Sequence, residues 1–486
     1  MLASLSQTNS PLDLSTQPSH ILVIFPKLEK FPKKFEVPGE SVLEKLLVRR
    51  EMQLPDLLKA PISANLENGE LCTWVMLDTE LSVFEQHGHL RKGLKLLLAE
   101  NPTEIYISVH GTSPQKKKFA ELITYITWLN GAILPIRKSE PAKKSLKSIF
   151  LHNYEGNENF LQQRAVAEGN LLARGLTMLP PNELTPKTYR EQIKKLAEYE
   201  GWKYEEFDFD TLKQMGAGAF VAVAQGSSEP NDAAIIHLQN NFKQSRSQKH
   251  IAIVGKGICF DTGGHNLKSA RYMQGMHEDM NGSAVALGIL LAATRAEIPI
   301  RIDCWLAIAQ NHLSPNAYKQ NDIITALNKI SIEIVHTDAE GRLILADTLN
   351  LAANLKPDLI IDFATLTGSM VTAIGSRYSG ILTNRDDLAQ KAITAGKISG
   401  ERVCVFPMDK DYEEDLESKV ADIKQCTLDS NVDHILAANF LSRFVNDLPW
   451  LHMDLSASNH KDGLGAVDSD ITGFGVNWGI EFLKTL

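Results

Sequence analysis

Short apolar runs alternate with longer segments of helical period along the first third of the chain. Ile21–Phe25, Leu71–Leu77 and Ile105–Val109 are apolar runs of strand length. After the second and third runs, apolar residues recur with the spacing of an amphipathic helix. This alternation predicts a small α/β domain over residues 20–152.

The segments that flank this domain have a different composition. Residues 1–19 are rich in Ser, Thr, Gln and Pro and lack the apolar core or basic stretch of a targeting signal, so we expect a disordered tail. Residues 153–159 are polar, and a helical period then runs from Phe160 to Met178, where two prolines follow. We therefore expect residues 153–178 to form a linker and a connector helix.

The alternation of strand-like and helical segments resumes after the connector. The predicted strands are Ala233–Leu238, Ile251–Val254, Ile300–Ala309, Ile332–Val335 and Leu359–Phe363. Helical segments separate them, which favours parallel pairing. The sequence thus predicts an α/β protein of two domains. The larger domain, residues 179–486, should contain a mainly parallel central sheet flanked by helices.

Composition narrows the classes of function. The 486 residues are 43% hydrophobic and 22% charged, as in folded globular proteins. The net charge of −9 gives no indication of nucleic-acid binding. The five scattered cysteines form no Cys-x-x-Cys pair, which favours a reducing compartment, the cytoplasm. The longest apolar stretch, Ala284–Ala293, is too short to span a membrane, so we expect no membrane partner.

Charged residues gather just after the predicted strand Ile251–Val254. Lys256, Asp261, Lys268 and Asp279 all follow it within one irregular stretch. Open parallel sheets bind their ligands beyond the carboxyl ends of the strands. These four residues are therefore candidates for a functional site, although a lysine or a turn aspartate taken singly is more often a surface residue.

A second acidic stretch follows Ile332–Val335. Asp338 and Glu340 are two residues apart, so in an extended loop both carboxylates project to the same side. If Asp261 and Asp279 converge there, the four carboxylates repel one another unless cations bind, and divalent metals accept such oxygen ligands. Taken alone, Asp338 and Glu340 are better explained by capping of the following helix.

The motifs around these residues resemble those of the leucyl (cytosol) aminopeptidase family in order and spacing. The most specific is the seven-residue run Thr337–Leu343. The other matching motifs are Pro181–Pro186, Val254–Gly257, Phe260–Gly264, Lys268, Asp279–Met280, Ala364–Gly368 and Pro449–Asp454. The resemblance covers roughly residues 160–486. It implies that residues 179–486 are a catalytic metallopeptidase domain that releases amino-terminal residues from peptides, leucine and other apolar residues being preferred.

The resemblance also implies a set of metal ligands. Two divalent ions, manganese or zinc, would be bridged by Asp261 and Glu340 and would activate a water molecule. Lys256 and Asp279 would complete one metal site, and Asp338 the other. Lysine ligates only as a neutral amine, and two adjacent dications favour its deprotonation.

Catalytic and substrate-binding roles follow from the same resemblance. Lys268 would stand as a cation beside the oxyanion of the tetrahedral intermediate. Arg342 would hold a bicarbonate ion that serves as general base. The carbonyl of Leu366 would receive the substrate amine, and Met276, Thr365 and Gly368 would line the pocket for the first side chain. The family typically forms a homohexamer.

Three residues depart from the family pattern. His265 and Ser269 stand where an aliphatic residue and a proline are frequent, and Asn281 replaces a small residue or cysteine. We expect His265 to pack within its loop or support the ligands rather than bind metal. The departures leave side-chain preference open.

Two other functions compete with the peptidase. Carboxylate-bridged ions also serve phosphoesterases, which need cationic or main-chain donors for the phosphate. A non-catalytic scaffold or DNA-binding protein is the third hypothesis, against which the acidic balance and the complete ligand set both argue.

Overall fold

The computed structural model describes residues 2–32, 37–139, 144–156, 160–240, 249–429 and 431–486. The chain divides into two compact units. The first comprises Met1–Leu171, Lys397–Gly400 and His460–Thr472, and the second comprises Leu172–Gly396, Glu401–Asn459 and Gly473–Leu486. The division falls within helix α4 (Leu161–Thr177), inside the segment predicted as a linker and connector helix. That two later segments belong to the first unit was not predicted.

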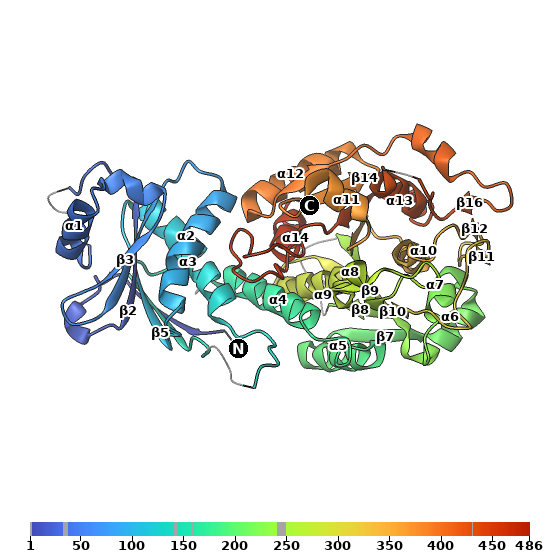
Figure 1. Ribbon diagram of the computed structural model, residues 1–486, viewed down its shortest axis with the longest axis horizontal. Helices are drawn as coiled ribbons and strands as arrows, with labels where there is room; N and C mark the ends of the chain where they lie inside the picture. Colours follow the sequence, from blue (N-terminus) through green and yellow to red (C-terminus); the bar gives the residue numbers. More distant parts are fainter. Residues whose placement is uncertain (1, 33–36, 140–143, 157–159, 241–248, 430) are drawn as a thin grey trace. The chain divides into compact units, whose positions relative to one another are not determined.

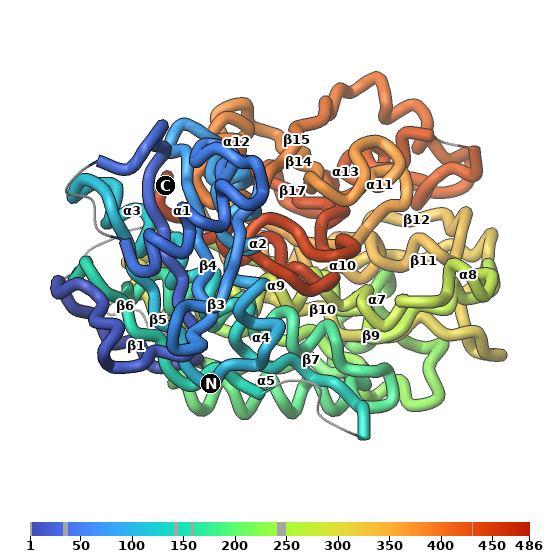
Figure 2. Tube along the Cα trace, turned by 60° about the vertical axis from the view of Figure 1, so that its left-hand side comes forward, coloured from blue at the N-terminus to red at the C-terminus, as the bar shows by residue number. Residues whose placement is uncertain are grey.

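The first unit is built on a six-stranded sheet (Figures 1 and 2). Its strands, in spatial order, are β1 (Ser4–Thr8), β6 (Ser148–His152), β5 (Glu104–Val109), β2 (His20–Pro26), β4 (Leu71–Leu77) and β3 (Ile62–Asn65). All neighbours pair in parallel except β3 and β4. Its helices are α1 (Glu40–Arg49), α2 (Val83–Leu98) and α3 (Ser113–Gly131). The small α/β domain expected from the sequence is present.

The expectation of a disordered tail over residues 1–19 differs from the structure. Ser4–Thr8 forms the edge strand β1, which pairs in parallel with β6 (Figure 2). The Trp128 Nε1 group also donates a hydrogen bond of 2.9 Å to the Ala3 carbonyl. An edge strand gains its main-chain hydrogen bonds whatever its side chains are, and the exposed or half-buried residues of β1 give no apolar pattern to read.

The second unit contains an eight-stranded sheet with a parallel centre. The spatial order is β15 (Val403–Val405), β14 (Ser379–Thr383), β17 (Trp450–Asp454), β13 (Leu359–Ala364), β9 (His250–Asp261), β10 (Arg301–Asn311), β8 (Ala234–Gln239) and β7 (Lys203–Asp208). The four central strands, from β17 to β10, are parallel, while β8 and β7 add antiparallel strands at one edge. The predicted α/β class is therefore confirmed.

Two details of the predicted sheet were wrong. The run Ile332–Val335 does not join the main sheet: Ser331–Glu333 forms β12, which lies with β11 (Ile323–Thr325) and β16 (Ile423–Lys424) in a separate three-stranded sheet. Strand β9 does not end at Val254 but continues to Asp261. Glycines at 255 and 257 interrupt the apolar pattern, although they remain within the strand.

Helices cover both faces of the main sheet (Figure 1). Those of the second unit are α5 (Pro186–Glu200), α6 (Phe209–Met215), α7 (Gly218–Ala224), α8 (Ala270–Met273), α9 (Asn281–Arg295), α10 (Glu340–Asn354), α11 (Gly368–Ile374), α12 (Asp386–Ser399), α13 (Asp433–Ser442) and α14 (Val476–Leu483). No helix among the described residues is long and apolar enough to cross a membrane. The five cysteines are free.

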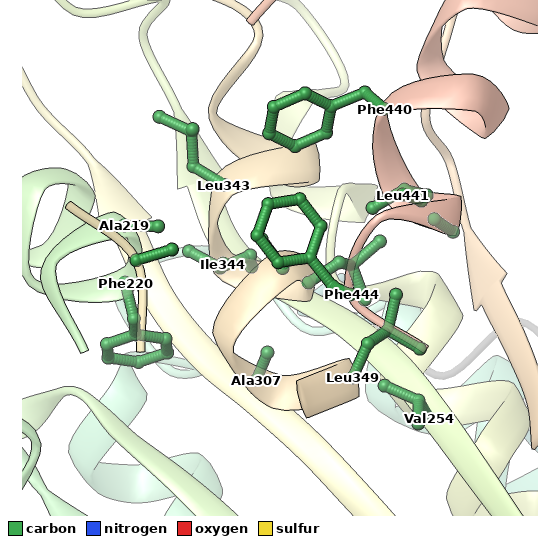
Figure 3. Close-up of a cluster of buried hydrophobic side chains, with 14 of the residues drawn as sticks. Ala219, Phe220, Val254, Ala307, Leu343, Ile344, Leu349, Phe440, Leu441 and Phe444 are labelled. Carbon is green, nitrogen blue, oxygen red and sulfur yellow. The ribbon is translucent and has the colours of Figure 1, made fainter. Parts of the chain in front are cut away.

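Helix α10 is the centre of the core on one face of the sheet. Leu343, Ile344 and Leu349 of α10 pack in one buried cluster with Val254 of β9 and Phe444, as Figure 3 shows. Its side chains are almost fully buried along the whole length. Removal of this apolar surface from water stabilises the packing of α10 on the sheet. It thereby fixes the first turn of the helix, which contains Glu340 and Arg342.

Helix α9 lies close to the sheet through glycines. A methyl group at Gly282 would overlap the Phe363 carbonyl oxygen of β13, and one at Gly255 would come within 2.5 Å of Ser283 Cα. Because successive residues of a strand point to opposite faces, Gly255 faces α9 while Val254 faces α10.

We expect Gly282→Ala to destabilise the second unit by about 1–3 kcal/mol, the usual cost of overpacking. The methyl group has no space between α9 and the β13 backbone. Urea unfolding followed by circular dichroism measures the loss. Gly175→Ala in α4, where a methyl group meets nothing within 4 Å, is the matched control and should be neutral or stabilising. Equal midpoints for the two variants would show that the close approach is not needed.

Candidate metal centre

A cavity of about 670 Å³ lies at the carboxyl ends of the parallel strands in the second unit. All the site residues predicted from the sequence line it, namely Lys256, Asp261, Lys268, Met276, Asp279, Asp338, Glu340, Arg342, Thr365, Leu366 and Gly368. Parallel β9, β13 and β17 all end toward it, at Asp261, Ala364 and Asp454. The topology therefore brings segments far apart in the chain to one place.

Strand β9 carries two of the charged residues itself. Lys256 and Asp261 are five residues apart, a spacing that places them on opposite faces of a regular strand. The pairing with β10 shifts between Ala309 and Asn311, where β9 contains one extra residue. This bulge turns Asp261 back toward the cavity that Lys256 faces.

Helix α10 begins directly above Lys256. A methyl group at Gly341 would come within 2.6 Å of the Lys256 Cε and 2.7 Å of its Nζ. Glycine at this position is what leaves room for the lysine side chain beneath the helix. Glu340 is the first residue of α10, so it is not part of an extended loop as the sequence suggested, and only Asp338 lies in the preceding loop.

Hydrogen bonds hold the Asp338 loop against the loop after β9. The Thr337 Oγ1 group donates to the Gly263 carbonyl at 2.6 Å and accepts from the Asn266 main-chain nitrogen at 2.8 Å. The Thr337 main-chain nitrogen donates in turn to Asn266 Oδ1 at 2.8 Å. Gly263 has a φ of +85°, a conformation that favours glycine. These contacts fix Asp338 beside Asp261 and Lys268.

The two lysines are the counter-charges of the four carboxylates. Lys256 Nζ lies 2.8 Å from Asp279 and 3.0 Å from Glu340. Lys268 Nζ lies 2.9 Å from Asp261 and 2.5 Å from Asp338. All four acids and both lysines are buried or nearly so, except Asp338 with 26% of its side chain exposed.

Burial and mutual repulsion change the pKa values of this cluster. Burial, opposed by the Lys256 cation, raises the pKa of Asp279 to about 8. Burial and the nearby Glu340 and Asp261 raise the pKa of Asp338 to about 7. Burial by itself lowers the pKa of Lys256, but the surrounding carboxylates outweigh it and raise that pKa. Two positive charges are thus too few to hold four carboxylates fully ionised.

This chemistry fits divalent metal ions. Asp261, Asp338 and Glu340 each offer one oxygen, and these atoms lie within 4.8 Å of one another. Clustered carboxylate oxygens are ligands for hard and borderline dications, whose charge offsets the repulsion within the cluster. The Lys256 nitrogen contacts both Glu340 and Asp279 and so connects Asp279 to the same set of donors.

Two residues that orient the predicted ligands or their neighbouring loop, Asn311 and Asp454, were not predicted as site residues. The Asn311 Nδ2 group donates to Asp261 Oδ1 at 2.8 Å and to Glu340 Oε2 at 3.3 Å. Asn311 ends β10 opposite Asp261, and only the strand register shows this. Asp454 accepts hydrogen bonds from the Leu366 main-chain nitrogen and the Thr367 hydroxyl and so shapes the loop after β13. The motif Pro449–Asp454 was the available signal for it.

Arg342 is engaged by the chain itself. Its Nη2 group lies 2.6 Å from Asp433 Oδ2, and its Nη1 group donates to the Gln425 carbonyl at 3.0 Å. The side chain is 2% exposed. Because a carboxylate of the protein already faces the guanidinium, the arrangement does not fit the bicarbonate ion that the resemblance implied at this residue.

The three residues that depart from the family pattern differ in their surroundings, because His265 and Ser269 are exposed whereas Asn281 is buried. His265 lies with its Nδ1 atom 3.0 Å from the Tyr318 carbonyl, in keeping with the expected role in its loop. Asn281, fully buried at the start of α9, donates to the Thr177 hydroxyl at 3.0 Å. Ser269 precedes α8 at its amino-terminal cap position.

Comparisons with known proteins show the family to which the chain is similar. The model of the cytosol aminopeptidase family, catalytic domain, matches residues 171–478. A probable cytosol aminopeptidase of Stutzerimonas stutzeri is 41% identical over 300 residues, which cover 62% of this chain and 60% of that protein. One of Pseudomonas fluorescens (strain SBW25) is 39% identical over 333 residues, or 67% of this chain and 66% of that protein. The matches thus span 60% and 66% of the length of these two relatives.

Solved structures extend the likeness to nearly the whole chain. The bottromycin maturation enzyme BotP in complex with Mn superposes with a TM-score of 0.81 and 26% identity, covering 96% of this chain and 99% of that one. A mutant of tomato leucine aminopeptidase gives a TM-score of 0.84 and 26% identity, covering 100% and 97%. The motifs, the arrangement of the site and these matches agree, and the chain belongs to the cytosol aminopeptidase family.

Proposed function

We propose that this protein is a metal-dependent aminopeptidase that releases amino-terminal residues, preferentially leucine and other apolar residues, from peptides. The observation that carries the proposal is the convergence of Lys256, Asp261, Asp279, Asp338 and Glu340 on one cavity. Membership of the cytosol aminopeptidase family supports the reaction class. The names of the relatives also support a cytoplasmic location.

Two divalent ions would be held by these five residues. Asp261 and Glu340, the central carboxylates, would bridge the ions, with Lys256 and Asp279 on one side and Asp338 on the other. When bound, such ions polarise the scissile carbonyl group and lower the pKa of a water molecule. Manganese and zinc are the expected ions, and the related BotP structure in complex with Mn supports manganese.

The remaining residues would bind and orient the peptide. Once the carboxylates bind metal, the Lys268 ammonium group is free to stabilise the developing oxyanion. The carbonyl of Leu366 would accept a hydrogen bond from the substrate amine, so that an acetylated amino terminus is excluded. Met276, Thr365 and Gly368 on the cavity wall would receive the first side chain.

The phosphoesterase hypothesis is less well supported. A phosphate needs cationic donors that are not already matched by carboxylates. Of the Lys and Arg side chains that line the cavity in the described part of the chain, Lys256 is a proposed metal ligand and Arg342 pairs with Asp433, so Lys268 alone would be left for a phosphate. A peptide amide carries no net negative charge, so it fits better into a cavity in which acidic side chains outnumber the available cations.

Mass spectrometry of peptide products tests the proposed function. The metal-loaded protein should shorten a leucyl peptide one residue at a time from its amino end and leave the same peptide intact when its amino group is acetylated. Internal cleavage, or equal cleavage of the acetylated peptide, would contradict an aminopeptidase.

Light scattering tests the homohexamer that we propose from the resemblance, and a monomer mass would refute it.

We expect Asn311→Ala to lower metal affinity or kcat/KM by about 10–100-fold, the usual effect of losing a partner that orients ligands. The side-chain amide of Asn311 donates hydrogen bonds of 2.8 Å to Asp261 and 3.3 Å to Glu340. Metal titration followed by peptidase assay measures the effect. Asn316→Ala, an exposed residue of the same unit, is the control and should behave as wild type. Unchanged metal affinity and rate in Asn311→Ala would show that the carboxylates need no such support.

A further inference from the structure

Asp433 and Arg342 form an ion pair on the wall of the catalytic cavity. Asp433 is the first residue of α13, and its side chain is 29% exposed, whereas that of Arg342 is 2% exposed. Both residues line the cavity together with Asp338 and Glu340. The pair therefore faces the space in which the proposed reaction takes place.

The surrounding framework fixes the arginine in this position. Its Nη1 group donates to the carbonyl of Gln425, whose side chain donates to the Ala339 carbonyl at 2.9 Å. The same side chain accepts hydrogen bonds from the main-chain nitrogens of residues 335 and 336. The guanidinium of Arg342 is therefore held by the anchored Gln425, which precedes α13, and by Asp433 at the start of α13.

We infer that Asp433 supplies, from within the chain, the anion that Arg342 would otherwise take from solution as bicarbonate. The inference rests on the proposed aminopeptidase function. The positive charge of Arg342 is already neutralised by Asp433. A second anion beside Arg342 would also be repelled by the Asp433 and Glu340 carboxylates. The enzyme would then work without added bicarbonate.

The carboxylate of Asp433 is also suited to move a proton. Its Oδ2 atom lies 2.6 Å from Arg342 Nη2, while its Oδ1 atom is buried and has no hydrogen-bond partner within the described part of the chain. As the attacking water forms its bond to the scissile carbonyl carbon, Asp433 takes up one proton of that water. It passes this proton to the leaving nitrogen as the carbon–nitrogen bond breaks, and the carboxylate is restored.

Two substitutions separate this role from a structural one. Asp433→Gly removes the carboxylate and opens space beside Arg342, whereas Asp433→Asn removes the charge but fills the same space. In bicarbonate-free buffer, both variants of the metal-loaded protein should lose about 10²-fold in kcat, the usual contribution of a general base. Added bicarbonate or formate should restore Asp433→Gly but not Asp433→Asn.

The wild type should show the same kcat with and without bicarbonate. A rate that rises severalfold with bicarbonate in the wild type would overturn the inference, as would failure of both anions to rescue Asp433→Gly that retains its metal content and melting temperature. Should Asp433→Gly not fold, full activity of Asp433→Asn without bicarbonate would overturn it equally.

A binding experiment keeps the inference independent of turnover. Calorimetric titration with bicarbonate should detect binding to Asp433→Gly and none to the wild type. Binding to the wild type would contradict the inference whether or not the protein is active. A wild type that cleaves no peptide under any metal, yet shows this binding pattern, would refute the proposed function while leaving the anion assignment in place.

Discussion

Replacing Glu340 with glutamine should lower kcat/KM by about 10³-fold or more and reduce the number of bound metal ions. Glu340 is 1% exposed and lies between Lys256 and Asn311, at the centre of the donor cluster. Glutamine keeps the size but loses the charge that would bridge two dications. Loss of several kcal/mol of metal-derived stabilisation corresponds to about three orders of magnitude in rate.

Metal analysis by plasma mass spectrometry, together with kcat/KM, measures the effect of Glu340→Gln. Glu417→Gln changes an exposed residue of the same unit and should leave both quantities unchanged. Cooperative thermal unfolding of Glu340→Gln shows that the fold is kept. A variant that retains both metals and more than about a tenth of the wild-type rate would contradict the bridging role.

Replacing Lys268 with methionine should lower kcat by about 10²–10³-fold while the metals stay bound, because one oxyanion donor is worth about 3 kcal/mol. The Lys268 ammonium group contacts Asp261 and Asp338 at 2.9 and 2.5 Å, and 14% of its side chain is exposed. It is therefore held at the metal ligands yet open to the cavity. Since the oxyanion forms only in the transition state, KM should change little.

Steady-state kinetics with parallel metal analysis separate the possible roles of Lys268. Lys268→Arg keeps the charge and should retain more activity than Lys268→Met. Lys319→Met, which removes an exposed lysine 3.9 Å from Asp322, is the control. A rise in KM at unchanged kcat would place Lys268 in substrate binding instead, and loss of metal would make it part of the metal site.

Periodicity predicted several of the buried strands, and motif spacing predicted a set of residues that the structure brings to one cavity. The apolar runs of β2, β4, β5, β8, β9, β10 and β13 were all visible, because buried strands of a parallel sheet carry continuous apolar residues. Edge strand β1 was missed, since its polar and half-exposed residues leave no such pattern. The predicted site residues Lys256 and Asp261 both line the cavity, and their place within β9 depends on the bulge opposite Ala309 and Asn311.

Residues whose importance lies in a long-range contact could not be predicted. Asn311 acquires its partners through strand register, and Asp433 meets Arg342 only because α13 packs beside α10. Neither contact can be predicted from the residues near it in the sequence. For the same reason, Lys397–Gly400 and His460–Thr472 gave no sign that they belong to the first unit, since membership is a matter of packing rather than of local sequence.

Titration of the metal-free protein with manganese is the most direct test of the central claim, that the carboxylate cluster holds the ions that drive peptide cleavage. Leucyl-aminomethylcoumarin hydrolysis and bound metal would be measured in the same samples. We predict no hydrolysis without metal and full activity once the five ligands are saturated with two ions per chain. Undiminished hydrolysis by protein shown to be free of metal, or saturation of the site with manganese and then zinc without any hydrolysis, would contradict the account.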